Sequence, residues 1–282
     1  MAPIHTIHIF LVMIANIQEF DTQYWVKTRA SLNPEQSTFL FWNGSIYASI
    51  PGKKRKLLFN LIGVSVSRCI PNAGGGWDYI SRELNYYLHP VTNEVLRRWE
   101  NPWTRETVPI VQIVNNPVQG YFKGKFPAYV DGDRTTFAFD IFPTYPNPLT
   151  KEPKFVEYSP QPTYETAEFF KLTVSTADLL DLKVKTVSKL ELNWNRTGQW
   201  LPWMRMGKFP GYLIYAARGK KANDFTQLPK ILQKEINTRC PSYKEAPSSH
   251  YNVEGMTTSG IYFKQHFNAC FDSQNQSYPK AG

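Results

Sequence analysis

The chain has 282 residues, 42% of them hydrophobic, which is enough apolar material for a sizeable core and excludes a disordered chain. Its formal charge is +9, from 32 Lys and Arg residues against 23 Asp and Glu residues, and these are spread along the sequence. Because no zinc-finger spacing, RNP-like pattern or basic helix accompanies the charge, we expect no nucleic-acid partner.

The N-terminal segment 1–24 contains an apolar run, IHIFLVMIANI at 7–17. The run lacks a basic flank and a clear cleavage site, and it is too short to span a bilayer as a helix. Two interpretations stay open: a secretory signal, or an arm that packs on the domain. The cellular compartment, cytoplasmic or secretory, is left open for the same reason. We expect no integral membrane span, and a single domain over 25–282.

Strand patterns dominate the chain, with runs of aromatic and β-branched residues bounded by Gly, Pro and Asn. Two basic runs, 53–56 and 218–221, follow strand-like segments and are interpreted as exposed hairpin turns. The predicted strands are 39–50, 56–70, 77–88, 95–99, 108–114, 121–126, 135–142, 165–175, 184–194, 211–217 and 260–267.

One helix is predicted, over 225–239, where Leu228, Ile231, Leu232 and Ile236 share a face. Many closely spaced strands with a single late helix favour a mainly β fold. We therefore expect a single antiparallel β-barrel, similar to lipocalins and calycins, with one C-terminal helix.

Signals of metal or nucleophilic catalysis are missing from the sequence. Its five histidines have no metal-ligand spacing, and its three cysteines, Cys69, Cys240 and Cys270, form no CxxC pair. We expect no metal and no cofactor. Buried free thiols are the simplest interpretation of the cysteines, and one disulfide stays open if the chain is secreted.

The predicted strand 77–88 carries polar residues among aromatic ones. Alternation places Tyr79, Ser81, Glu83, Asn85 and Tyr87 on one face, and Arg82 on the more apolar face. An arginine there needs a partner. Arg82 either forms an internal salt bridge, for example to Glu106 or Glu191, or donates a hydrogen bond into a pocket.

The stretch GQWLPWMRMGKFPGYLIYAARGKK at 198–221 mixes aromatic, sulfur and basic side chains. As an extended segment it would place Trp203 and Arg205 on one side and Met204 and Met206 on the other. We interpret this segment as the rim of a pocket, with one side facing the core and the other a ligand.

Residues 78–118, which include SRELNYYLHPVTNE and ENPWTRE, resemble the pattern SRExxxYxDPxTGE…WxNPWTGE…VxNDPV of DUF1838, a family of unknown function. LPWMRMGKFPGYLIYAARGKK at 201–221 resembles its second block, and the resemblance spans about 25–265. Four positions depart from the pattern: His89, Asn93, Arg105 and Asn116. They put in doubt any role for acids at 89 and 116.

The chain is also similar to fungal secondary-metabolism proteins that include hetero-Diels–Alderases of tropolone–sesquiterpenoid biosynthesis. This resemblance implies a cofactor-free pericyclase that joins a quinone methide to a terpene alkene. Holding both partners in place is worth about 7–11 kcal/mol in favourable cases. One donor on the carbonyl oxygen adds about 3–4 kcal/mol.

The expected donors are Arg82, Arg205 and Tyr87, and the expected partners are apolar small-molecule substrates. A carrier without turnover, and a hydrolase, lyase or isomerase with Glu83 or His266 as base, are the alternatives. A homodimer is left open. The residues expected to line the substrate site are Trp42, Trp99, Trp203, Met204, Met206, Tyr215 and Asn115.

Overall fold

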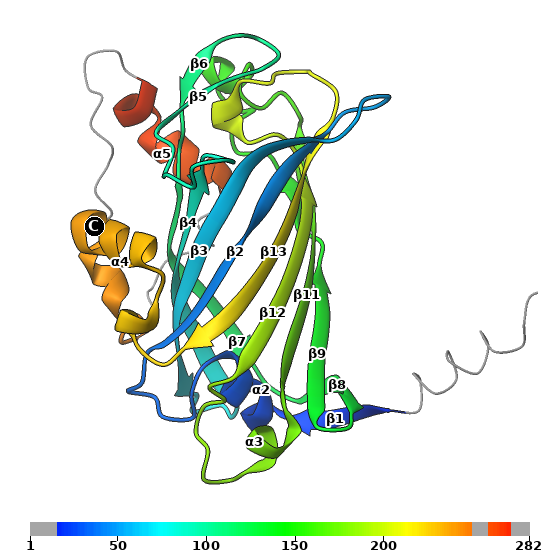
Figure 1. Ribbon diagram of the computed structural model, residues 1–282, viewed down its shortest axis with the longest axis vertical. Coiled ribbons are helices and arrows are strands. Elements are labelled where there is room, and N and C mark those ends of the chain that lie inside the picture. The colour runs from blue at the N-terminus through cyan, green and yellow to red at the C-terminus, as the bar shows by residue number, and fades with distance from the viewer. Residues whose placement is uncertain (1–15, 250–258, 272–282) are drawn as a thin grey trace, which may run out of the picture.

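The computed structural model describes residues 16–249 and 259–271 (Figure 1). Most of the apolar run at 7–17 therefore lies outside the described residues, as does the side chain of Cys270. Cys69 and Cys240 are buried free thiols.

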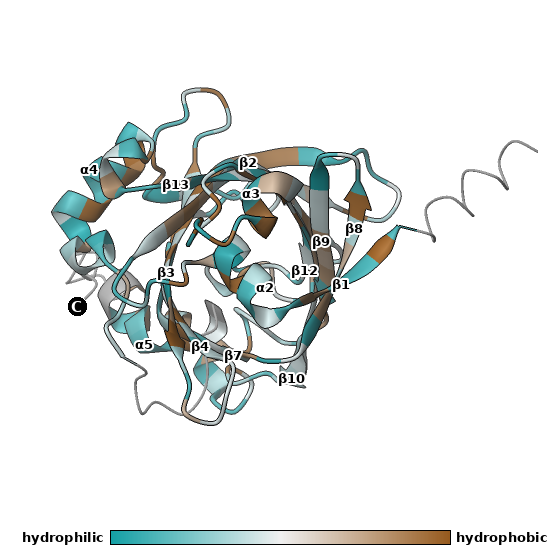
Figure 2. Cartoon of the chain, turned by 90° about the horizontal axis from the view of Figure 1, so that it is seen from below, coloured by the Kyte–Doolittle hydropathy of each residue, from teal (hydrophilic) through white to brown (hydrophobic). Residues whose placement is uncertain are grey.

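One antiparallel sheet, curled into a half-barrel, forms the body of the molecule (Figures 1 and 2). The mainly β, antiparallel, barrel-like fold expected from the sequence is confirmed. A short strand, β10 (Thr144–Pro146), pairs with β11, and β5 (Arg98–Glu100) and β6 (Thr107–Pro109) form a separate ribbon. Along the sheet the order is β1 (Ile17–Asp21), β8 (Lys125–Asp131), β9 (Arg134–Ile141), β11 (Thr163–Ser175), β12 (Leu190–Gly198), β13 (Tyr212–Ala222), β2 (Thr38–Ser49), β3 (Lys56–Pro71), β4 (Trp77–Leu88) and β7 (Ile113–Phe122).

The connection from β7 to β8 forces the sheet to curl. β7 is the last strand of the sheet and β8 is next to the first, yet only Lys123 and Gly124 separate them in sequence. So short a link spans about 10 Å at most, so the two edges must meet at this corner. The rings of Phe122 and Phe126 both pack on Trp25 there, with centroids 5.8 and 5.4 Å from it.

Both faces of β3 are covered, which explains its long apolar sequence. Leu61 points to the concave side, where most of the core lies. Ile62 and Val64 point outward, under helix α4 (Lys230–Arg239). Leu232 and Ile236 of α4 are fully buried on that outer face, and burial of each such side chain is worth about 1.5–3 kcal/mol.

Helix α2 (Thr22–Arg29) lies within one end of the half-barrel, beside the short α3 (Thr176–Leu180) (Figure 2). Two inward-pointing lysines, the buried Lys27 and the partly buried Lys221, hold these helix ends. Lys221 Nζ donates to three carbonyl oxygens at the end of α2, at 2.7–3.1 Å. Lys27 of α2 donates to three carbonyl oxygens at the end of α3. The predicted exposed turn at 218–221 is therefore wrong: β13 continues to Ala222, and Lys221 points into the interior. The basic turn after Pro51 is exposed, as expected.

The C-terminal region differs most from expectation. Residues 260–267, predicted as a strand, lie in helix α5 (Ser259–Phe271). Phe263, Phe267 and Phe271 recur every four residues, so they share one helix face and pack against Phe155 and Tyr158. The expectation of a single C-terminal helix is therefore wrong.

The predicted helix 225–239 divides at Pro229 into the 3-10 turn η3 (Phe225–Gln227) and α4, because proline has no N–H for a helix interior. The strand boundaries predicted between residues 95 and 126 also differ from those of β5, β6, β7 and β8 in the structure. β12 begins six residues later than predicted, since 184–189 bonds to α2 instead: Val187 N donates to the Lys27 carbonyl oxygen at 3.0 Å.

Candidate functional site on the concave face

The inward face of β4 carries the polar residues that alternation predicted. Tyr79, Ser81, Glu83, Asn85 and Tyr87 lie on the concave side, where Tyr79 and Tyr87 belong to the interior clusters. Asn85 Oδ1 accepts from the indole Nε1 of Trp42 on β2 at 2.8 Å. A polar band thus crosses the concave face between apolar layers.

Glu83 is the central acid of this band. Its side chain is about a quarter exposed (24%), and its nearest cation is Arg29 of α2, with Oε1 3.8 Å from Nη2. Burial raises the pKa of the Glu83 carboxyl, with the Arg29 charge opposing the rise and the Glu168 charge adding to it. Glu83 is therefore a weak acid that holds its proton more tightly than an exposed glutamate.

Glu168 of β11 is the second carboxylate on the concave face, and it is well paired. Trp194 Nε1 donates to its Oε2 at 3.0 Å, and Arg196 Nε lies 3.4 Å from its Oε1. The two acids have different surroundings. Glu168 accepts from an indole and pairs with a guanidinium at 3.4 Å, whereas Glu83 bonds to the hydroxyls of Ser65 and Ser81 and has a guanidinium at 3.8 Å. Glu83 is the candidate acid of the two, because burial raises its pKa.

A row of aromatic rings crosses the same face, from Phe139 on β9 through Phe170 on β11 to Trp194 on β12. Phe139 and Phe170 stack at 4.8 Å, and Phe170 and Trp194 are near-parallel at 6.3 Å. These rings are cross-strand neighbours in the register of the sheet. We call Phe139, Phe170 and Trp194 the aromatic row. Phe139 and Phe170 are only partly buried, so the row offers a flat apolar surface.

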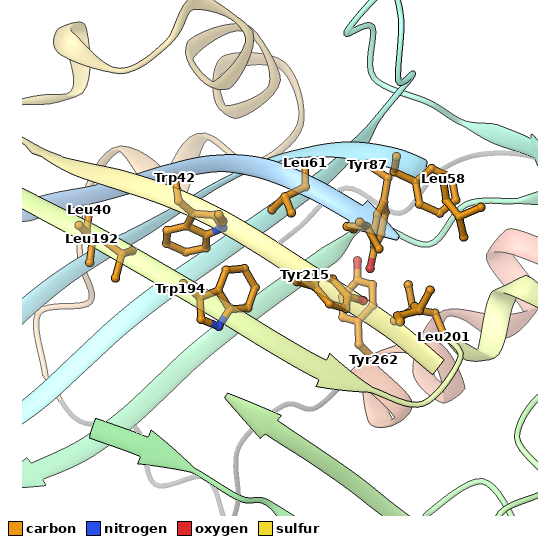
Figure 3. Close-up of a cluster of buried hydrophobic side chains, with 14 of the residues drawn as sticks. Leu40, Trp42, Leu58, Leu61, Tyr87, Leu192, Trp194, Leu201, Tyr215 and Tyr262 are labelled. Atoms are coloured by element: carbon orange, nitrogen blue, oxygen red, sulfur yellow. The ribbon is translucent and has the colours of Figure 1, made fainter. Parts of the chain in front are cut away.

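Tyr215 and Tyr87 lie beyond Trp194 in the same buried cluster (Figure 3). Tyr215 packs on Trp194, with ring centroids 5.9 Å apart. The hydroxyls of Tyr87 and Tyr215 are buried, and neither makes a hydrogen bond of normal geometry within the described part of the chain. Burial raises the pKa of Tyr87 well above its usual value, and that of Tyr215 to about 12. Both phenols are therefore neutral donors.

Arg82, expected as a donor into the pocket, is on the outer face. Its guanidinium donates to the Asn116 side chain at 3.2 Å and to the backbone oxygens of Ser242 and Glu245. The donor role is wrong, and so is the alternative of a salt bridge to Glu106 or Glu191. The residues after α4 cover the outer face of β4 and supply its partners instead.

Arg205, the second expected donor, is also outside the site. The segment 202–204 forms the 3-10 turn η2 (Pro202–Met204), and Arg205 follows it in the left-handed conformation. Its side chain pairs with Glu106 at 3.4 Å and Glu157 at 3.2 Å. The extended alternation assumed for 203–206 is therefore wrong, because a turn has no two-residue period.

The remaining predicted site residues divide into two groups. Trp42 and Asn115 lie on the concave face, and Asn115 is the cross-strand partner of Glu83. Trp203, Met204 and Met206 are almost fully buried and belong to the core of the concave side. Trp99 packs on Trp203 with centroids 6.0 Å apart. Trp203, Met204 and Met206 therefore do not form an accessible rim, and Trp99 is partly buried beside Trp203.

His266, the alternative base, lies on α5 and stacks on Tyr262, with its Nδ1 2.9 Å from the Tyr262 carbonyl oxygen. It forms no contact with Glu83 among the described residues. Within 16–249 and 259–271, no three His, Cys, Asp or Glu side chains gather as metal ligands would.

Several concave-face residues were missed from the sequence: Arg29, Phe139, Glu168, Phe170, Trp194 and Arg196. Alternation along 163–175 places Glu168 and Phe170 on one face, so the signal for these two was present. No sequence signal placed Arg29 on the concave face, because helix α2 has no clear apolar stripe in its sequence.

The fold and this site define a mainly β half-barrel with a concave face that combines acids, buried phenols and stacked aromatic rings. The chain belongs to the DUF1838 family, described as "Protein of unknown function (DUF1838)", whose model matches residues 35–267. No curated protein matches the chain. None of the helices in the described part of the chain is long and apolar enough to cross a membrane.

Proposed function

We propose that the chain is a cofactor-free cyclase of fungal secondary metabolism, which joins a quinone methide to a terpene alkene in a hetero-Diels–Alder reaction. The observation that carries the proposal is the position of Glu83, a partly accessible acid with a raised pKa on the same face as the aromatic row. A raised pKa increases the fraction of the Glu83 carboxyl that carries a proton and can donate a hydrogen bond.

The reaction requires two unsaturated apolar molecules to be held face to face. Phe139 and Phe170 offer a stacked apolar surface for this purpose. The electron-poor partner becomes more reactive when a donor binds its carbonyl oxygen, and one aligned donor is worth about 3–4 kcal/mol. Glu83 takes this donor role in place of Arg82 and Arg205. Tyr87 also remains a candidate donor, through its buried neutral phenol.

The direct test is to incubate the purified protein with a quinone methide precursor and a humulene-type terpene. We expect a faster reaction and a single stereoisomer. An unchanged rate and unchanged stereochemistry would contradict the enzyme for that pair. Binding without turnover would instead support a carrier of apolar molecules.

A general acid–base enzyme, such as an isomerase, lyase or hydrolase, is the second candidate, and the raised pKa of the partly accessible Glu83 carboxyl favours it. The two candidates differ in what they require of Glu83. A cycloaddition needs only a donor, which glutamine supplies through its amide. Proton transfer needs the acid itself. Glu83→Gln should therefore keep much of a cycloaddition and abolish acid–base catalysis.

A further inference from the structure

A separate groove of about 740 Å³ lies outside the half-barrel, between the segment 153–160, the turn at 207–208 and helix α5. This volume lies within the range of about 300–1,000 Å³ that small-molecule sites occupy. None of the residues that line the groove belongs to the concave face described above. The groove is therefore a second candidate site, with its own chemistry.

The walls of the groove are apolar and rigid. Tyr158 and Phe267 meet edge to face at 5.3 Å, and Phe267 also packs on Phe155 at 5.1 Å. Val156 beside them is 44% exposed. Pro153 and Pro160 restrict the backbone of the segment that carries these side chains. The groove therefore presents accessible apolar surface on a stiff support.

The rim of the groove is positively charged. Arg205 and Gly207 both adopt positive φ, at 51° and 52°, and the turn they form places Lys208 at the rim. Lys154 lies over the Phe267 ring, 5.8 Å from its centroid. Lys208 is exposed, and no carboxylate among the described residues pairs with it.

The other charges around the groove belong to ion pairs. Arg205 pairs with Glu106 and Glu157, and Glu152 pairs with Lys154 and Lys264. Four cations against three carboxylates leave these surroundings with one net positive charge. The charges counted are Lys154, Arg205, Lys208 and Lys264 against Glu106, Glu152 and Glu157.

We propose that this groove binds an apolar carboxylate, with the apolar body against Val156, Tyr158 and Phe267 and the carboxylate beside Lys208. The apolar wall is complementary to the body of such a molecule, and the net positive charge and the exposed Lys208 ammonium are complementary to its carboxylate. The site is independent of the function proposed for the concave face, because the two share no lining residue.

Isothermal titration calorimetry with 2-naphthoate and 2-naphthamide tests the charge requirement, because the two probes share one ring system. We expect 2-naphthoate to bind about threefold to fivefold more tightly, as one exposed charge pair allows. Lys208→Glu should remove or reverse this preference. Lys220→Glu, at an exposed lysine on the outer face of β13, is the matched control and should keep it. Equal affinities for the two probes, or an unchanged preference in Lys208→Glu, would overturn the proposal.

A photolabel locates the bound molecule. Benzophenone-4-carboxylate should mark peptides that contain Val156, Tyr158 or Phe267, and 2-naphthoate should compete with it. Labelling confined to β9 and β11 would overturn the groove as the site. Glu83→Gln should leave both results unchanged, and Lys208→Glu should leave cycloaddition unchanged, so failure of one proposal is distinguishable from failure of the other.

Discussion

Glu83 on β4 lies 3.8 Å from Arg29 on α2, across the concave face of the half-barrel. That distance is longer than a hydrogen bond, so the guanidinium offsets only part of the burial that raises the pKa of Glu83. A carboxyl group in this position favours its neutral form. The acid can therefore donate a hydrogen bond to a molecule that lies against the aromatic row.

The first prediction concerns stability and pH. Because the pKa of Glu83 is higher in the folded protein than in the unfolded chain, the contribution of Glu83 to stability is present at low pH. It is lost as the pH rises from about 4.5 through the folded-state pKa. Glu83→Gln has no such loss. Its melting temperature relative to wild type should therefore be higher at pH 8 than at pH 4.

Glu191→Gln is the control for this measurement, since Glu191 is exposed on the outer face of β12 and pairs with Arg134. Each tenfold change in the acid dissociation constant on folding corresponds to about 1.4 kcal/mol. If the difference between Glu83→Gln and wild type is the same at both pH values, Glu83 is not perturbed as described.

The second prediction uses two neighbouring phenylalanines on β11. Phe170 stacks on Phe139 on the concave face, whereas Phe169 packs on Phe142 on the outer face and is 41% exposed. Phe170→Ala should reduce affinity for the apolar substrate at least about fivefold, because it removes stacking area worth about 1–3 kcal/mol. Phe169→Ala should leave affinity unchanged. Titration of intrinsic tryptophan fluorescence measures both, and equal effects would contradict the assignment of the concave face.

The third prediction separates structure from catalysis at Arg82. Its guanidinium joins β4 to the Ser242 and Glu245 carbonyl oxygens on the outer face. Arg82→Gln should lower the free energy of unfolding by about 1–3 kcal/mol, the usual cost of leaving such groups without partners. Urea denaturation measures this cost. Turnover per folded molecule should stay within about twofold of wild type, and a large loss of turnover would restore Arg82 to the site.

The fourth prediction concerns Lys221, which donates to three carbonyl oxygens at the end of α2. Lys221→Met has a similar shape but no donors, so the Thr28 carbonyl oxygen loses this partner. The Lys27 and Ala30 oxygens keep only Val187 N and the Thr186 hydroxyl. We expect a loss of about 1–3 kcal/mol in unfolding free energy. Lys220→Met, one residue earlier and exposed, should cost less than about 0.5 kcal/mol. Equal losses would show that the α2 contact contributes little.

Alternation along β4 correctly grouped Tyr79, Ser81, Glu83, Asn85 and Tyr87 on one face, which lies on the concave side. Asn115 and Tyr215 also lie on the concave side, as expected. The same reasoning failed at Arg82, because a two-residue period separates two faces without saying which face is covered by a later segment. It also failed at Arg205, where the chain turns, and at Lys221, where a partly buried lysine finds carbonyl partners supplied by a helix about 190 residues earlier.

Helix α5 illustrates a different difficulty. Its sequence is rich in aromatic residues, which favours strand, yet its three phenylalanines recur every four residues. The choice between the two-residue period of a strand and the period of a helix depends on Phe155 and Tyr158. These residues lie about 100 residues earlier and pack against the helix face. Local sequence did not contain that information.

The most direct test of the account is the rate of cycloaddition by Glu83→Gln and Glu83→Leu at neutral pH. If Glu83 acts as a neutral hydrogen-bond donor, the glutamine variant should retain activity within about tenfold of wild type. The leucine variant should then lose about 10²–10³-fold, the cost of removing one donor. Equal and complete loss in both variants would contradict the donor role and favour acid–base catalysis, and full activity in both would remove Glu83 from the mechanism.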